Sequence, residues 1–363
     1  MRNRRPALSA LAGAVSAALT LSACGDMSGG EPARQSGTIG IAMPTRSSER
    51  WLVDGRSVVE DLRDVGYRTR LVYGQDDPKT QASQIRSLIA QHVSALIIAA
   101  IDNKSLDGVL GQAAAAKIPV ISYDRLVLGT KNVDYYASFD NEQVGRLQAH
   151  YIVEKLGLEE GKGPFTIELF AGSPDDNNTK YFFDGAMHLL QPYLDSRQLV
   201  VRSGRTALDE ITTPRWDGAA AKKRMAEVLS TSYRTRRIDA VLSPYDGMSL
   251  GILSALRSDG YGSAAKPFPL ITGQDAELPS VKSIIAGGQS QTVYKDSREL
   301  AQVAANMVDA VLTHHQVRVN DTVTYNNGVK AVPAYLLQPT SVDKSNYEVA
   351  LVATDYYTAA QLK

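Results

Sequence analysis

Two pairs of polar residues lie where they could bind a small polar molecule. Asp124–Arg125 directly follows the apolar run 119–123, and Asp140–Asn141 directly follows the run 135–139. Short apolar runs of this kind are typical of buried strands. In open α/β sheets, ligands bind outside the carboxyl ends of the strands, where loops present polar side chains without disturbing the core. The two pairs therefore predict a polar small-molecule site.

The second half of the chain places further polar loops after short predicted strands. Each loop offers a carboxylate, an amide or an ammonium group, and the loops are 172–178, 245–247, 273–275 and 295–296. Carboxylates and amides form hydrogen bonds with hydroxyl groups, and cationic side chains neutralise the carboxylates. Two tryptophans, Trp51 and Trp216, could lay their flat rings on the C–H faces of a pyranose. This combination is typical of a site for a polyhydroxylated ligand.

Alternating strand and helix patterns supply the elements that would hold these loops. From residue 38 the chain alternates short apolar strands with amphipathic helices up to residue 140, and the same order returns over 166–272. Short connections between alternating elements favour parallel sheets with helices on both faces. We therefore predict an α/β protein with two doubly wound lobes. The segment 322–337 should form extended crossing strands with a turn at 326–328.

The N-terminal segment predicts export and lipid attachment. Residues 1–23 combine a basic start with an Ala- and Leu-rich middle, as in a signal peptide. Leu21–Cys24 matches the bacterial lipobox, in which cleavage precedes an acylated cysteine. Cys24 is the only cysteine, so we interpret it as the acyl site. Residues 24–37 would then be the acylated cysteine and a flexible tether. A plain secretory signal is the alternative, and an envelope with one membrane or two fits both.

The composition argues against several other classes of protein. The chain has 39 basic and 39 acidic residues, and removal of residues 1–23 leaves 36 basic residues, so nothing indicates a nucleic-acid partner. No second apolar stretch is long enough to cross a membrane. The five histidines share no ligand spacing, and we find no calcium loop, phosphate loop or nucleophile elbow. We therefore expect no metal and no cofactor.

Several short motifs together resemble one family of binding proteins. The motifs are 47–51 (SSERW), 99–102 (AAID), 123–125 (YDR), 136–141 (YASFDN), 172–178 (GSPDDNN), 244–247 (PYDG) and 273–276 (GQDA). Over residues 38–363 the chain is similar to the multiple-monosaccharide-binding receptors related to periplasmic xylose- and galactose-binding proteins. The resemblance implies a type I periplasmic binding fold, in which two lobes joined by three crossing segments close on an aldose. The aldose is then handed to an ABC permease.

The resemblance also implies which side chains contact the sugar. Trp51 and Trp216 would stack on its ring. The residues that would bind its hydroxyls are Arg50, Asp124, Arg125, Asn141, Asn178, Asp246, Asp275 and Lys295. The implied N-terminal lobe is 38–140 with 296–331, and the implied C-terminal lobe is 141–295 with 332–363, with hinges near Asn141, Lys295 and Pro333. We expect an extracytoplasmic monomer that is anchored to the cell membrane through Cys24 and meets ABC permease subunits there.

Two other functions would use the same residues. A glycosidase would need a carboxylic acid of raised pKa, whereas acids accompanied by Arg, Lys and Asn have lowered pKa values. A sugar-sensing receptor would share the pocket and differ in the surface that it presents to a membrane signalling partner. Single residues also have structural interpretations, because Asp176 could cap a helix, Trp216 could belong to the core and Arg125 could pair with Asp124. The preferred aldose stays open, since epimers differ by one hydroxyl.

Overall fold

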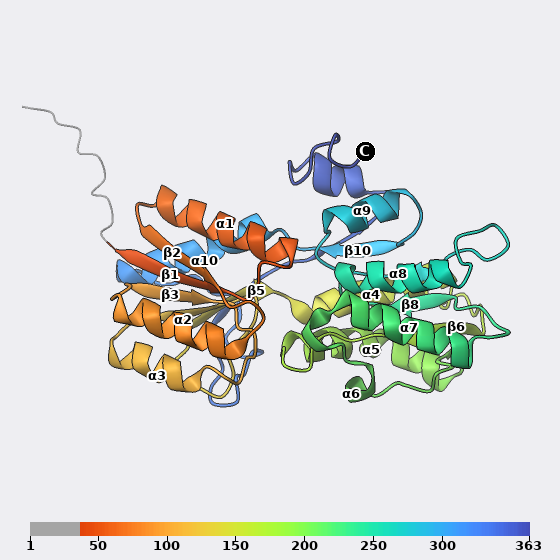
Figure 1. The fold of residues 1–363 in the computed structure, drawn as a ribbon, viewed down its shortest axis with the longest axis horizontal. Helices are drawn as coiled ribbons and strands as arrows, with labels where there is room; N and C mark the ends of the chain where they lie inside the picture. The colour runs from red at the N-terminus through yellow and green to blue at the C-terminus, as the bar shows by residue number, and fades with distance from the viewer. Residues whose placement is uncertain (1–36) are drawn as a thin grey trace, which may run out of the picture. The chain divides into compact units, whose positions relative to one another are not determined.

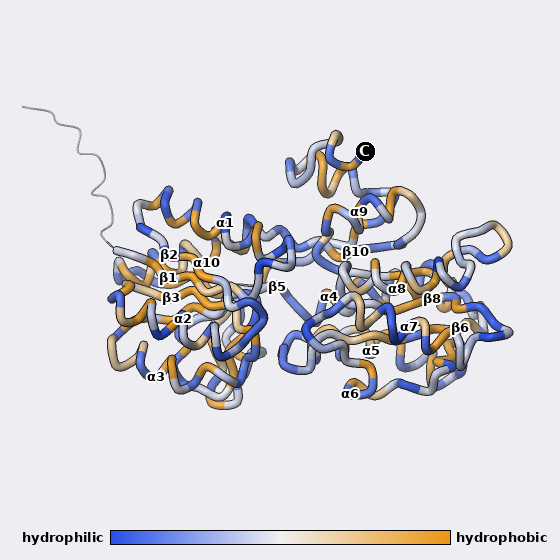
Figure 2. The backbone as a smooth tube through the Cα atoms, viewed as in Figure 1, coloured by the Kyte–Doolittle hydropathy of each residue, from blue (hydrophilic) through white to orange (hydrophobic). Residues whose placement is uncertain are grey.

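The structure, a computed structural model, describes residues 37–363. The predicted signal peptide, Cys24 and all but the last residue of the predicted tether lie outside this range. Within it, strands and helices alternate (Figure 1). Hydrophobic positions gather along strands such as β1 and β3, and polar positions gather in many of the connections (Figure 2). Among residues 37–363, no helix is both long and apolar enough to cross a membrane.

The N-terminal lobe is built on a six-stranded parallel sheet with the strand order β11-β5-β4-β3-β1-β2. The strands are β1 (Thr38–Met43), β2 (Arg68–Tyr73), β3 (Ala95–Ile98), β4 (Val120–Tyr123), β5 (Tyr135–Phe139) and β11 (Ala334–Leu337). The helices are α1 (Glu49–Asp64), α2 (Pro78–Ala90), α3 (Asp107–Ala115) and α10 (Ser297–Leu312). The residues of β3 show why helices cover both faces of the sheet. Its residues Ala95 and Ile97 join the core under α1 and α10, while Leu96 and Ile98 join the core under α2 and α3.

The C-terminal lobe has a parallel sheet with the order β7-β6-β8-β9 and an antiparallel pair, β10-β12. The strands are β6 (Phe165–Leu169), β7 (Leu199–Val200), β8 (Ala240–Leu242), β9 (Leu270–Ile271), β10 (Gln291–Tyr294) and β12 (Thr340–Asp343). The helices are α4 (Asn141–Leu156), α5 (Asn178–Asp195), α6 (Leu208–Ile211), η1 (Pro214–Trp216), α7 (Gly218–Ser232), α8 (Asp246–Ser258), α9 (Leu278–Ile285) and η2 (Glu348–Val352). A bridge between Gln274 and Val293 sets β10 beside the end of β9. The predicted α/β fold with two parallel-sheet lobes is confirmed.

The chain crosses between the lobes three times, and the third crossing corrects our prediction. The first two crossings fall between β5 and α4 and between β10 and α10. We assigned residues 332–363 to the C-terminal lobe, but β11 pairs in parallel with β5, with Ala334 opposite Tyr136. The third crossing therefore falls between Leu337 and Thr340, after Pro333 rather than at it. A four-residue apolar strand carries no sequence signal for which sheet edge it joins.

Candidate functional site

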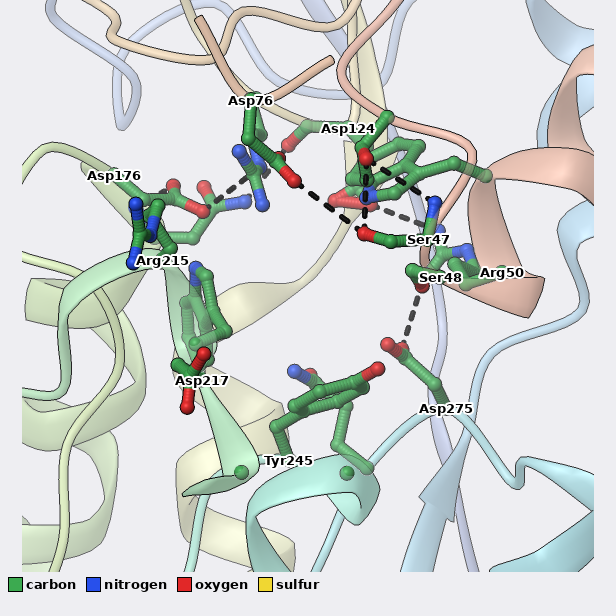
Figure 3. Close-up of a pocket in the computed structure, with 18 of the residues that line it drawn as sticks. Ser47, Ser48, Arg50, Asp76, Asp124, Asp176, Arg215, Asp217, Tyr245 and Asp275 are labelled. Atoms are coloured by element: carbon green, nitrogen blue, oxygen red, sulfur yellow. Dashed lines mark hydrogen bonds and ion pairs between the residues drawn. The ribbon is translucent and has the colours of Figure 1, made fainter. Parts of the chain in front are cut away.

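A cavity of about 520 Å³ is lined by residues of both lobes. Its size falls within the range of small-molecule sites. Eight of the ten predicted sugar-binding residues line it, namely Arg50, Trp51, Asp124, Arg125, Asn178, Trp216, Asp275 and Lys295. They come from loops after strands and from the first turns of helices, where the lobes face each other (Figure 3). The carboxyl ends of the strands therefore form the walls of the cavity, as the sequence predicts.

Arg50 is the centre of a buried ion-pair network at the base of the cavity. It lies in the first turn of α1 and is 6% exposed. Its guanidinium donates to Asp54 at 2.8 Å, to Asp124 at 2.8 Å and to Asp275 at 2.7 Å. Asp54 and Asp124 belong to the N-terminal lobe, whereas Asp275 follows β9 of the C-terminal lobe. Arg50 therefore ties the two lobes together at the base of the cavity.

A second cation, Lys295, completes this network. The Lys295 Nζ lies 3.0 Å from the Asp275 carboxylate and 3.9 Å from the Asp124 carboxylate. Burial alone would raise the pKa of Asp124, but the charges of Lys295, Arg50 and Arg125 hold that pKa below its ordinary value. The Asp124 carboxyl is therefore ionised at neutral pH, where it can accept hydrogen bonds and cannot act as a general acid.

The carboxyl of Asp54, which lies behind the network, has a raised pKa, in contrast to that of Asp124. Burial raises the pKa of Asp54 to about 7, although its ion pair with Arg50 opposes the shift. The Asp54 carboxyl accepts a hydrogen bond from Arg50 through one oxygen, and its other oxygen has no hydrogen-bond partner among residues 37–363. Asp54 is fully buried, so it supports Arg50 from behind rather than facing the cavity.

The loop after β4 holds Asp124 and Arg125 in place through backbone contacts. Asp124 has a φ of +57°, and its carbonyl oxygen accepts hydrogen bonds from Tyr136, Ser138 and Asn178. A left-handed non-glycine residue is strained, and such residues cluster at functional sites. The three hydrogen bonds to this carbonyl oxygen hold the loop in its strained conformation. One of the donors, Asn178, belongs to the other lobe.

Arg125 forms an ion pair with Asp176. The alternative from the sequence, an ion pair with the neighbouring Asp124, is not formed. The Arg125 Nε lies 2.9 Å from the Asp176 carboxylate, and the guanidinium lies 5.1 Å from the centre of the Trp51 ring. Burial raises the pKa of Asp176, and Arg125 opposes that shift. The arginine is thus held between a carboxylate of the C-terminal lobe and an aromatic face of the N-terminal lobe.

Trp216 forms an aromatic wall on the side of the C-terminal lobe. Its ring lies 6.0 Å from that of Phe182 and 6.2 Å from that of Tyr245, both in edge-to-face geometry. The ring also lies against Gly172, where an added Cβ would be 2.0 Å from the ring. Trp216 has a φ of +58°, so the short helix η1 ends at this residue, and α7 begins only after Asp217.

Two predicted site residues lie behind the cavity wall, and this corrects our expectation that they line it. Asn141 is fully buried, and its amide donates to Asn178 at 3.0 Å. Asp246 is also fully buried and accepts from Gln289, from Thr292 and from the backbone of residue 277. Burial, and then the Glu277 carboxyl, raise the pKa of Asp246 well above its ordinary value. Protein donors thus occupy the Asp246 carboxyl, and Asn141 orients Asn178.

Sequence reasoning missed several lining residues. Asp176 was interpreted as a possible helix cap, and in the structure it both accepts from the Asn178 backbone and pairs with Arg125. Its position in the Asp-Asp-Asn-Asn run was the available signal. Other lining residues that we did not select include Ser47, Ser48, Asp76, Arg215 and Tyr245. Among residues 37–363, no group of three or more His, Cys, Asp or Glu side chains could hold a metal ion.

These features define a two-lobed α/β protein with a polar cavity, suited to binding a small molecule, that both lobes line. Residues 39–316 match the Periplasmic binding protein domain, and the chain belongs to the periplasmic binding protein family. The chain is 57% identical over 326 residues to the multiple sugar-binding periplasmic protein SbpA of Azospirillum brasilense, with 90% of this chain and 91% of that protein covered. It is 54% identical over 331 residues to the multiple sugar-binding periplasmic receptor ChvE of Rhizobium radiobacter, with 91% and 94% covered.

A solved structure supports the same relationship. It is an ABC transporter solute-binding protein from Clostridium phytofermentans with bound β-D-glucose, with a TM-score of 0.87 and 42% sequence identity. The match covers 90% of this chain and 100% of that chain. The family resemblance inferred from the motifs is thereby confirmed. The relatives are binding proteins, and this chain is accordingly a binding protein and not an enzyme.

Proposed function

We propose that this protein binds aldose monosaccharides, such as xylose, glucose, galactose and arabinose, and delivers them to an ABC importer. The observation that carries the proposal is the shared network in which Arg50 and Lys295 hold the carboxylates of Asp124 and Asp275. Ionised carboxylates beside fixed cations present acceptors and donors together, which suits the hydroxyl groups of a sugar. The names of SbpA and ChvE and the glucose in the related structure agree with this ligand class.

The cavity supports one arrangement of the ligand. Trp216 would cover one C–H face of the pyranose, and the Arg125–Trp51 stack would lie on the N-terminal side. Asp124 and Asn178 would bind hydroxyls from one edge, and Arg50, Asp275 and Lys295 from another. Asn141 and Asp246 would act indirectly, by positioning Asn178 and the loop after β9. Direct contacts to the sugar are thus proposed for eight side chains.

Closure of the lobes is the proposed response to binding. The three crossings after Phe139, Tyr294 and Leu337 would act as the hinge between a lobe of 38–140 with 296–337 and a lobe of 141–295 with 340–363. Small-angle scattering should show a smaller radius of gyration after addition of a bound sugar. An unchanged radius with saturating sugar would contradict hinge closure.

A thermal-shift panel tests the ligand class. We would mix the Cys24→Ser chain without residues 1–23 with common aldoses, polyols, amino acids and a nucleoside, and recover each ligand by chromatography. A ligand that binds only the folded state raises the melting temperature with ln(1 + [L]/Kd), so aldoses should stand out and be recovered unchanged. No shift with any aldose, or an altered sugar, would overturn the proposal.

We further propose that Cys24 carries the lipid that anchors the protein to the membrane. The lipobox-like sequence at 21–24 supports this, and an acylated cysteine with two or more chains gives stable anchoring. The Cys24→Ser variant should move from the membrane fraction to the soluble extracytoplasmic fraction. Retention of this variant in the membrane would argue against the lipid anchor. We expect the released protein to be monomeric by light scattering.

A further inference from the structure

Nine charged side chains line the cavity, and seven of them already have partners. Four belong to the network of Arg50 and Lys295 described above. Two form the Arg125–Asp176 pair. The seventh is Asp217, whose carboxylate caps α7 by accepting from the Ala220 backbone at 2.7 Å. The two that remain are Asp76 and Arg215, which have opposite charges.

Asp76 and Arg215 lie on opposite lobes at the more exposed end of the cavity. Asp76 is in the loop between β2 and α2, and Arg215 is in η1 (Figure 3). Arg215 is exposed and Asp76 is half-buried, whereas Arg50 is buried at the base. Among residues 37–363, neither Asp76 nor Arg215 forms an ion pair. The Asp76 carboxylate accepts only a long hydrogen bond, 3.4 Å, from Ser47.

Backbone contacts hold the two loops that carry Asp76 and Arg215 in defined conformations. Asp76 has a φ of +57° and Arg215 a φ of +56°, and each is next to another left-handed residue. The Asp76 amide donates to the carbonyl of residue 44, and the Arg215 amide donates to the Ser173 hydroxyl. Strained non-glycine residues persist only where the surroundings hold them, so these two loops have defined shapes. One of them also carries Trp216.

We propose that Asp76 and Arg215 form an ion pair across the mouth when the lobes close on a sugar, and that this pair latches Trp216 against the ligand. The inference rests on the proposed function and adds two positioning residues to it. The base of the cavity is already joined by Arg50 and Asp275, so closure has only to bring the exposed ends together. The Asp76–Arg215 pair is the final contact of that movement.

The latch predicts a specific pattern of affinities for D-glucose. Partly exposed ion pairs contribute little energy, so Asp76→Asn and Arg215→Gln should each weaken binding by about three- to fivefold. The loss should appear in the dissociation rate, because the pair forms only after the sugar is bound. The double variant should bind no more weakly than either single variant, since each removes the same interaction. The swap Asp76→Arg with Arg215→Asp should recover most of the wild-type affinity.

Stopped-flow kinetics and calorimetry of these variants test the inference, with Asp64→Asn and Arg236→Gln as controls that remove exposed charges outside the cavity. Salt should weaken wild-type binding towards the level of the single variants. Additive losses, or a swap that rescues nothing, would mean that each side chain contacts the sugar separately and would overturn the latch. Unchanged affinity in both single variants would overturn it as well. Wild-type protein that binds no aldose would overturn the proposed function, and the latch with it.

Discussion

The two lobes have the same strand order but contribute different chemistry to the cavity. In the N-terminal lobe the order is β2-β1-β3-β4-β5-β11, and in the C-terminal lobe β7-β6-β8-β9 is continued by β10 and β12. The N-terminal lobe contributes an arginine with a buried acid behind it, while the C-terminal lobe contributes a tryptophan on a strained loop. A shared topology therefore fixes where a site lies, and the loops after the strands decide what it binds.

The lobes also use buried carboxyl groups in different ways. In the N-terminal lobe, Asp124 is paired with cations and its pKa is lowered by Lys295 and Arg50 against the effect of burial. In the C-terminal lobe, Asp246 is surrounded by neutral donors, and burial raises its pKa. Both follow a strand end, so position alone does not separate an acid that lines the cavity from one that lies behind its wall. The charge of the nearest partner does.

Removal of Arg50 should have the largest effect, because Arg50 contacts carboxylates of both lobes. Arg50→Met would leave Asp54, Asp124 and Asp275 without their common cation, and stranded buried charges cost about 3–5 kcal/mol. We expect sugar affinity to fall by more than about 100-fold and urea stability to fall with it. Calorimetry and urea unfolding measure the two effects. Arg63→Met, on the exposed end of the same helix, should leave both close to wild type.

Two acids of the C-terminal lobe, Asp275 and Asp246, provide a matched pair of variants. Asp275→Ala removes a carboxylate that lines the cavity, and affinity should fall by at least about tenfold. Asp246→Ala removes a carboxyl that only protein groups contact, so affinity should stay within about threefold while stability falls by about 2 kcal/mol. Equal losses of affinity in the two variants would show that Asp246 belongs to the site after all. Calorimetry and urea unfolding again provide both numbers.

The aromatic wall can be altered directly, at Trp216, or indirectly, at Gly172 behind its ring. Trp216→Ala should weaken sugar binding at least about tenfold through lost stacking. Gly172→Ala should act in the same direction, because its Cβ would lie 2.0 Å from the Trp216 ring and displace it. Gly108→Ala is the control, since a Cβ there has no atom within 4 Å. Wild-type affinity in Gly172→Ala would show that the position of the ring is unimportant.

The smallest expected effect is on the pH dependence of stability. Burial raises the pKa of Glu277 to about 7, with a smaller contribution from Asp275 and against the hydrogen bond from Tyr245. The folded state thus holds a proton that the unfolded state has lost, so the stability from Glu277 is present below about pH 4.5 and is lost as pH rises through about 7. Glu277→Gln should flatten the melting temperature between pH 5 and pH 8 relative to wild type. Parallel curves for both proteins would contradict this.

The sequence predicted the strand-end loops well because strands and helices leave periodic patterns. Eight of the proposed site residues line the cavity, and they lie in loops or in the first turns of helices. What the pattern could not show is the direction of a side chain. Asp246 begins α8 as a site residue would, yet its carboxyl turns towards Gln289 and Thr292. Asp176 has the sequence of a cap, and its second oxygen nevertheless reaches Arg125.

The pairing of β11 with the N-terminal sheet could not be predicted from the sequence, for a different reason. The register of β11 beside β5 depends on an open sheet edge formed some 200 residues earlier in the chain. Such a long-range pairing leaves no local signal, since the same apolar run would suit either lobe. The break before α7 was equally hidden, because Arg215 and Trp216 adopt left-handed conformations that their residue types do not favour.

The interleaved crossings also govern the order in which the molecule can be completed. The N-terminal sheet receives its edge strand β11 and its covering helix α10 only after the whole of 141–295 has been synthesised. Until then, the core face beneath Leu300, Ala304 and Val308 stays uncovered. The first lobe therefore cannot finish folding as it leaves the ribosome, and the two lobes must mature together. A chain with this connectivity therefore remains incompletely folded until its last third has been synthesised.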